Sequence, residues 1–212
     1  MSDFDRSPDG IAFSEAVRRV QTQRGSRRIY EVAEWPIDIT KNLEVFISAQ
    51  RSAFLATASS GGLPYVQHRG GPPGFLRLLD SRTLAMADFH GNRQYITLGN
   101  LSENDRVLLF LIDYTHLRRV RIWGRAEVVE NDMALVAALT PAGARADRAL
   151  VIRVEAWDEN CPRHIPMLLE ADELRQRLAQ RDARIADLER EVAVLTQQLA
   201  TRDICGDDLW SD

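Results

Sequence analysis

The chain has 212 residues, a hydrophobic fraction of 45% and a formal charge of -4 at pH 7. This length accommodates one full core and a small appendage, because domains usually run to about 100 to 150 residues. The acidic balance, with no basic stripe, argues against nucleic acid as a partner. No apolar run approaches the roughly 20 residues that span a bilayer, and the N-terminus lacks a leader or transit pattern, so we expect no membrane association and a cytoplasmic protein.

The first predicted elements are helices. Residues 1–12 contain Asp, Ser, Pro and Gly signals and are predicted to be disordered. A short helix lying on the domain is predicted over 13–23, because apolar residues recur there at helical spacing: Phe13, Ala16, Val17 and Val20. A second helix is predicted to follow a cap at Asp38 or Thr40 and to turn three residues inward: Leu43, Phe46 and Ile47.

From residue 54 onward the pattern changes to short strands with brief helices between them. We predict helices over 95–100 and 133–139 and strands over 54–58, 64–69, 75–79, 83–88, 106–112, 117–130 and 150–157. The strand over 117–130 alternates apolar residues with a polar face that contains Arg121 and Arg125. Six or seven closely spaced strands favour a mainly β protein with helices (α+β), built as an antiparallel Greek-key barrel.

The end of the second predicted strand carries three polar side chains in a row: Gln67, His68 and Arg69. A loop of Gly and Pro follows them. This is unusual composition for a core strand, which prefers β-branched and aromatic residues. Donor-rich side chains beside a loop of small residues suit a polar ligand, and Arg69 is the natural partner of an anion.

A second polar segment, residues 88–94, leaves a strand and enters a predicted helix. Gly91 permits a tight turn, Asn92 can cap the helix, and Arg93 lies beside the helix start. Helix N-termini and guanidinium groups both favour phosphate oxygens, so this segment is a candidate phosphate site. The alternative for each residue alone is structural: a helix cap for Asn92 and a solvated side chain for Arg93.

Four sequence blocks occur in an order that resembles the flavin-nucleotide-binding proteins related to pyridoxamine 5'-phosphate oxidase. The blocks are 66–75, 91–93 with 98–101, 121–124, and 156–158 followed by 160–162. The resemblance covers roughly residues 38 to 164 and implies a split β-barrel. It also implies FMN bound at the interface of a two-fold homodimer.

The resemblance assigns six residues to the cofactor. Gln67, His68 and Arg69 match the strand that runs along the flavin ring and the ribityl phosphate, and Asn92 and Arg93 match the turn that holds the phosphate. A further aromatic residue, Trp157, matches a position that reaches the cofactor from the other subunit. The basic and hydroxyl residues that grip the substrate phosphate in true pyridoxamine phosphate oxidases are not recognisable as a set, so the oxidase activity does not carry over.

Beyond the barrel, apolar residues fall on alternating steps of three and four, interrupted only by Arg181: Ala171, Leu174, Leu178, Ile185, Leu188, Val192, Leu195 and Leu199. This is the a/d seam of a coiled coil. The residues at g and e are opposite in charge at five-residue spacing, as pairs 170 and 175, 177 and 182, and 184 and 189. A helix packed along the barrel would explain the apolar seam but not this charge pattern, which is typical of parallel pairing.

We therefore expect four regions: an N-terminal segment over 1–37, an FMN-binding split-barrel domain over 38–166, a coiled-coil helix over 167–200 and an acidic tail over 201–212. Cys161 and Cys205 lack the spacing of a zinc site, so we expect free thiols and no metal site.

Three functions are compatible with the sequence. The first is an FMN-dependent oxidoreductase or flavin reductase, with NAD(P)H as an electron donor for a small-molecule substrate. The second is a non-enzymatic FMN carrier or sensor. In the third, the split barrel holds haem or a deazaflavin, and His68, His90 or His164 is an axial ligand.

Overall fold

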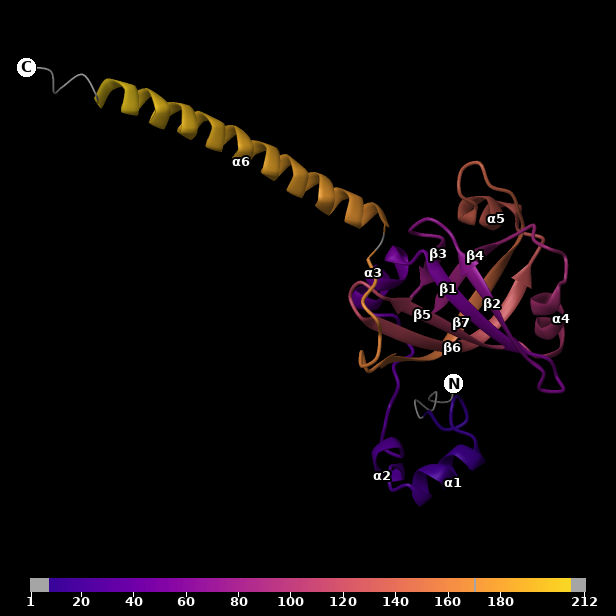
Figure 1. Cartoon of the computed structure of the whole chain (residues 1–212). Helices are drawn as coiled ribbons and strands as arrows, with labels where there is room; N and C mark the ends of the chain where they lie inside the picture. Colours follow the sequence, from indigo (N-terminus) through magenta and orange to yellow (C-terminus); the bar gives the residue numbers. More distant parts are fainter. Residues whose placement is uncertain (1–7, 170, 207–212) are drawn as a thin grey trace, which may run out of the picture. The chain divides into compact units, whose positions relative to one another are not determined.

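The structure, a computed structural model, describes residues 8–169 and 171–206, with side chains described as far as residue 199 (Figure 1). The chain divides into two units, Met1–Pro166 and Met167–Asp212. Half of the expected acidic tail, residues 207–212, lies outside the described residues. Over the part that the structure describes, no helix has both the length and the apolar character needed to cross a membrane.

The first unit is built on one antiparallel sheet with strand order β2-β1-β5-β6-β7-β4-β3 (Figure 1). Its strands are β1 Ser52–Ala58, β2 Pro64–Gly70, β3 Leu76–Asp80, β4 Thr83–Phe89, β5 Arg106–Asp113, β6 Arg118–Val129 and β7 Ala146–Asn160. Every predicted strand is present, and the mainly β split-barrel fold is confirmed. Strand β7 is longer than predicted because it pairs with both β4 and β6.

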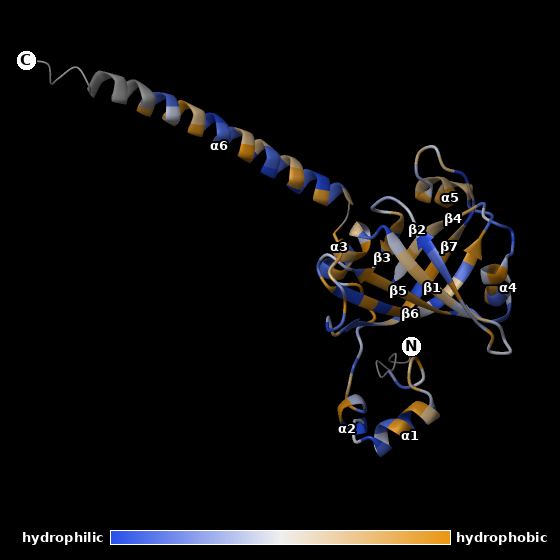
Figure 2. Ribbon diagram, viewed as in Figure 1, coloured by the Kyte–Doolittle hydropathy of each residue, from blue (hydrophilic) through white to orange (hydrophobic). Residues whose placement is uncertain are grey.

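Buried and exposed side chains alternate along the strands, and the buried ones form the core. In β6, Val120 and Ile122 are fully buried, while Arg121 and Arg125 lie on the opposite face, as the sequence predicts. The core also takes fully buried leucines and isoleucines from β1, β5 and β7: Leu55, Leu109, Leu111, Leu150 and Ile152. Apolar residues are prominent along these strands in Figure 2.

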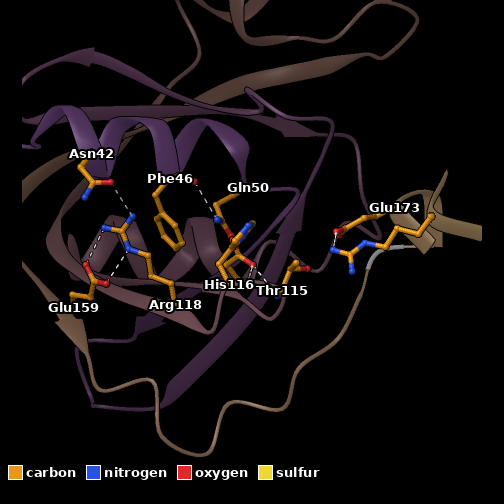
Figure 3. A network of polar contacts seen from close by, with 10 residues as sticks. Asn42, Phe46, Gln50, Thr115, His116, Arg118, Glu159 and Glu173 are labelled. Atoms are coloured by element: carbon orange, nitrogen blue, oxygen red, sulfur yellow. Dashed lines mark hydrogen bonds and ion pairs between the residues drawn. The ribbon is translucent and has the colours of Figure 1, made fainter. Parts of the chain in front are cut away.

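Helix α3 (Lys41–Ala49) begins where the sequence predicts, with Thr40 Oγ1 accepting from the Leu43 backbone N–H at 3.3 Å. Its Phe46 ring is covered by the Arg118 guanidinium at 4.5 Å, a cation–π contact. That guanidinium also donates to Glu159 Oε1 and Oε2 at 3.0 and 2.9 Å and to Asn42 Oδ1 at 3.4 Å (Figure 3). The network ties α3 to β6 and β7.

Two further helices flank the sheet. Helix α4 (Ile96–Glu103) follows β4 and runs three residues beyond its predicted end. Helix α5 (Met133–Leu139) has the bounds predicted from the sequence, with Asp132 as its cap, and it packs a smaller apolar cluster against β4 and β7.

The N-terminal segment differs from the prediction in two respects. Residues 8–12 are ordered as a turn, because Asp9 accepts hydrogen bonds from Arg27 at 2.6 and 2.9 Å, so the disorder predicted for them is wrong. Helix α1 (Glu15–Gln23) exists, but its apolar face is not packed on the domain: Val20 is 54% exposed. A short helix, α2 (Arg27–Tyr30), was not predicted.

Aromatic stacking attaches this segment to the barrel. The ring of Phe13 meets the edge of Trp35 with a centroid separation of 5.4 Å, and Trp35 stacks on Trp123 of β6 at 4.7 Å. Such pairs contribute about 0.5 to 1.5 kcal/mol each beyond their burial. The contact residues therefore come from the turn before α1 and the connection after α2, and the apolar face of α1 stays exposed.

Substitution of Gly124 is expected to strain the β6–β7 pair. A Cβ at this position would lie 2.3 Å from the Arg153 carbonyl oxygen, next to the irregularity between Trp123 and Gly124. Gly124→Ala should therefore lower the free energy of unfolding by about 1 to 3 kcal/mol in urea titrations. The matched control is Gly99→Ala in α4, where added bulk meets open space and helix propensity improves stability by up to about 1 kcal/mol. Equal stability of the two variants would contradict the prediction.

The second unit contains one long helix, α6 (Ala171–Gly206), so the predicted helix is confirmed. It begins four residues later than the expected coiled-coil region and continues into the expected tail.

Candidate functional site

The side chains of β2 alternate between two faces of the sheet edge. Tyr65, Gln67 and Arg69 share one face and line a surface cavity with the loop that follows β4 and the start of α4. Thr97 of α4 links two of them: its hydroxyl donates to Gln67 Oε1 at 2.7 Å and accepts from Arg69 Nη2 at 3.5 Å. The first turn of α4 therefore fixes the polar end of β2.

Asp88, near the end of β4, forms the charged base of this cavity. Its Oδ1 accepts a hydrogen bond from Arg69 Nη1, and its Oδ2 lies 3.6 Å from Arg148 Nε on the adjoining strand β7. All three side chains are largely buried, between 10% and 12% exposed. Arg148 is also near Glu130 and Asp147, but neither its Nε nor that of Arg69 has a hydrogen-bond partner among the described residues.

The loop after β4 carries a second polar chain. Arg93 Nε and Nη2 lie 3.1 and 3.0 Å from His90 Nε2, and His90 Nδ1 lies 2.9 Å from Asp147 Oδ2. Because the guanidinium can only donate, Nε2 is the acceptor and the ring proton resides on Nδ1. This chain joins the loop to the start of β7.

Asn92 caps the loop rather than the helix. Its Oδ1 accepts from the Gln94 backbone N–H at 3.2 Å, and α4 begins only at Ile96. The predicted role as a helix cap is therefore wrong, because two left-handed residues, Arg93 and Tyr95, separate the turn from the helix. The cap position, Tyr95, makes no side-chain capping bond within the described residues. The first residues of α4, whose N–H groups this side chain does not cap, line the cavity.

The structure brings together four of the six residues that the sequence assigned to a cofactor: Gln67, Arg69, Asn92 and Arg93. His68 lies on the other face of β2, where its Nε2 is 2.8 Å from Ser52 Oγ and its ring meets Phe54. Trp157 also lies outside the cavity within one chain, donating from Nε1 to the Asp38 carbonyl oxygen at 3.0 Å.

Residues that sequence reasoning missed complete the cavity: Asp88, Thr97, Asp147 and Arg148. Asp88 was part of the noted segment 88–94 but had no role assigned. Arg148 lies in a stretch expected to precede its strand, and only the pairing of β4 with β7 places it opposite Asp88. No local motif marks such a cross-strand ion pair.

The pKa of Asp147 is lowered from its ordinary value, chiefly by the hydrogen bond from His90. Unfolded Asp147 therefore takes up its proton at a higher pH than folded Asp147, so its contribution to stability is present at neutral pH and disappears as the pH falls through the folded pKa. His90→Ala should raise the pKa of Asp147 in carboxyl NMR titrations. Asp80 is the control, because backbone N–H groups chiefly lower its pKa. An unchanged Asp147 would contradict this account.

Comparison with solved structures identifies similar chains of low sequence identity. A putative pyridoxamine 5'-phosphate oxidase from Lactobacillus delbrueckii is 21% identical, with TM-score 0.47 over 58% of this chain and 95% of that one. HupZ from Group A Streptococcus is 19% identical, with TM-score 0.48 over 57% and 93%. An FMN-binding protein from Syntrophomonas wolfei is 16% identical, with TM-score 0.41 over 74% and 98%.

Among curated proteins, none matches the sequence significantly. The family model described as pyridoxamine 5'-phosphate oxidase matches residues 39–161, which is more than half of the chain. The chain therefore belongs to the pyridoxamine 5'-phosphate oxidase family.

Proposed function

We propose that the cavity between β2, the loop after β4 and the start of α4 binds the phosphate end of FMN, and that the protein is an FMN-dependent oxidoreductase or flavin reductase. The observation that carries this proposal is that Arg69, Arg93 and the first residues of α4 all line one cavity. Guanidinium groups and a helix N-terminus both bind phosphate oxygens, and family membership makes a flavin phosphate the preferred anion.

The residues present fit this group. Arg69 Nε is buried without a hydrogen-bond partner among the described residues, and Arg93 is exposed at the cavity mouth. A buried unpaired donor is unfavourable, so a ligand that accepts from it gains a desolvated, charge-assisted contact. Asp88 holds Arg69 in place and Thr97 orients Gln67.

When bound, FMN supplies the redox chemistry, and the protein contributes positioning and access. Gln67 is the candidate to hydrogen-bond polar edges of the ligand beyond the phosphate, because its amide nitrogen remains after Oε1 accepts from Thr97. The chain formed by Arg93, His90 and Asp147 keeps the loop against β7. A second copy would supply Trp157, which lies outside this cavity in its own chain.

Two histidines are poorly disposed to act as haem ligands. Both ring nitrogens of His90 already have partners, Arg93 and Asp147, and His68 lies on the other face of β2, outside this cavity. An axial ligand needs a ring nitrogen free to face the iron. These contacts favour the flavin over the haem alternative at this cavity.

The test is the absorption spectrum of the purified protein after incubation with FMN and gel filtration. Retained flavin bands, followed by NAD(P)H consumption with an added electron acceptor, support an oxidoreductase. Retained flavin without turnover of either nicotinamide would favour the carrier or sensor function. A Soret band, or no retained chromophore, would contradict the proposal.

A further inference from the structure

Helix α6 presents an apolar seam that stays exposed along its length. The seam residues at positions a and d are between 39% and 62% exposed: Leu174, Leu178, Ile185, Leu188, Val192, Leu195 and Leu199. Figure 2 shows hydrophobic and hydrophilic residues alternating along this helix. Most helical stability in proteins comes from packing an apolar face, so a helix of 36 residues gains little from an uncovered seam.

We propose that the partner of this seam is a second copy of the same chain, paired parallel and in register as a two-stranded coiled coil. At about 1.5 Å per residue, the seam from 171 to 199 is about 43 Å long. The inference is independent of FMN binding, because it rests on α6 alone.

Charge complementarity favours the parallel arrangement. With Ile185 at position a, Arg177 and Arg184 occupy g, and Asp182 and Glu189 occupy e. In a parallel pair, each g residue faces the e residue five positions further along the second copy. Arg177 then meets the second copy's Asp182, and Arg184 meets its Glu189. Both attractive contacts occur twice because of the two-fold symmetry.

Antiparallel pairing is disfavoured by the same residues. In an antiparallel pair, e residues face e residues and g residues face g residues. Two alignments of the antiparallel helices give the longest overlap of the seam. One places Asp182 opposite Asp182 of the second copy, and the other places it opposite Glu189. Contacts between like charges are destabilising. Opposite charges are therefore paired consistently only when the two helices run in the same direction.

Arg181 sets the register. It occupies a d position within the apolar seam, and its guanidinium lies 3.5 Å from Asp182 of its own helix. In register, the two Arg181 side chains share one layer flanked by two Asp182 carboxylates. A shift of one heptad would instead place each arginine opposite leucine, Leu174 or Leu188. A single polar layer commonly specifies register at some cost in stability.

A membrane surface is a poorer partner than a second copy. Helices that lie in a lipid interface usually carry Lys and Arg over their polar face. In α6, acidic and basic residues occur in nearly equal number, and several form ion pairs within the helix, such as Arg177 with Glu173 at 2.6 Å.

The test is disulfide cross-linking of the full-length protein with Cys161 and Cys205 replaced by Ser. Leu188→Cys places a thiol at d, where each residue faces its own counterpart in a parallel pair. Ala183→Cys, at the outer position f, is the matched control. Mild oxidation should convert most of the Leu188→Cys protein, and little of the control, into a dimer on a non-reducing gel. No linkage at residue 188, or equal linkage at both positions, would overturn the proposal.

Charge exchange tests the pairing further, in the same Leu188→Cys background. Arg177→Glu with Arg184→Glu reverses the g positions, and Asp182→Arg with Glu189→Arg reverses the e positions. Each variant alone should cross-link less than the parent, and an equimolar mixture should form mainly the mixed dimer. These side chains are exposed and lie outside the barrel, so thermal unfolding of the barrel should not change. Equal amounts of mixed and unmixed dimers would overturn the charge-based orientation.

Discussion

FMN affinity is expected to fall about 10- to 100-fold when Arg69 is replaced by Ala, because a charge-assisted contact contributes roughly 1.5 to 3 kcal/mol. Arg69 is one of two buried cations of the cavity, with Arg148, and its Nε has no hydrogen-bond partner among the described residues. Asp88 also lies 3.6 Å from Arg148 in the unaltered protein, so its negative charge should still have a positive partner when Arg69 is removed. The measurement is quenching of flavin fluorescence during titration with protein.

Two controls distinguish the loss of a contact with the phosphate from a general weakening of flavin binding. Arg77→Ala removes an exposed arginine of β3 that does not line the cavity, so FMN affinity should be unchanged. Riboflavin lacks the phosphate, so its weaker binding should be insensitive to Arg69→Ala. A similar loss of FMN and riboflavin affinity would show that Arg69 supports the fold of the site and does not contact the phosphate.

Asp88→Ala is expected to lower the free energy of unfolding by about 3 to 5 kcal/mol, because it leaves two buried guanidinium groups without their shared carboxylate. Arg69 and Arg148 are 11% and 12% exposed, so solvent cannot fully replace the lost partner. Asp88→Asn keeps the shape of the side chain and some hydrogen bonding, so its cost should be smaller. Urea unfolding of each variant measures the difference.

The control for this prediction is an exposed ion pair of the same barrel. Asp105 accepts from Arg125 at 2.8 Å, and both side chains are more than 40% exposed. Exposed pairs contribute about 0 to 1 kcal/mol, so Asp105→Ala should have a small effect. If Asp88→Ala were no more destabilising than Asp105→Ala, the buried charge cluster would not have the structural role assigned to it.

Local patterns predicted most of the barrel because each strand carries its own periodicity. The alternation from Val120 to Ala126 assigned the two faces of β6 correctly, and α3 begins after Thr40, one of its two predicted caps. The missed features depend on contacts between distant residues. Trp35 stacks on Trp123, and the extension of β7 through Ala146 requires β4 as a partner. The two partners in each contact are too far apart in the sequence for a local pattern to indicate that they meet.

In the candidate site too, local sequence patterns predicted some features, and contacts between distant residues determine the others. Sequence reasoning found the polar segment of β2 and the turn after β4, but it could not separate Gln67 and Arg69 from His68. Neighbouring strand residues point to opposite faces, and both faces of β2 mix polar and apolar side chains, so composition does not show which face meets α4. Asp88 and Arg148 meet only through strand pairing.

The most direct measurement of FMN binding at this cavity compares FMN with riboflavin on the unaltered protein by fluorescence titration. The two ligands share the flavin ring and differ in the phosphate that Arg69, Arg93 and the start of α4 are proposed to hold. Binding of FMN at least about tenfold tighter than riboflavin is the predicted result, since each charge-assisted contact contributes more than a neutral hydrogen bond. Equal affinities, or no binding of either flavin, would contradict the account.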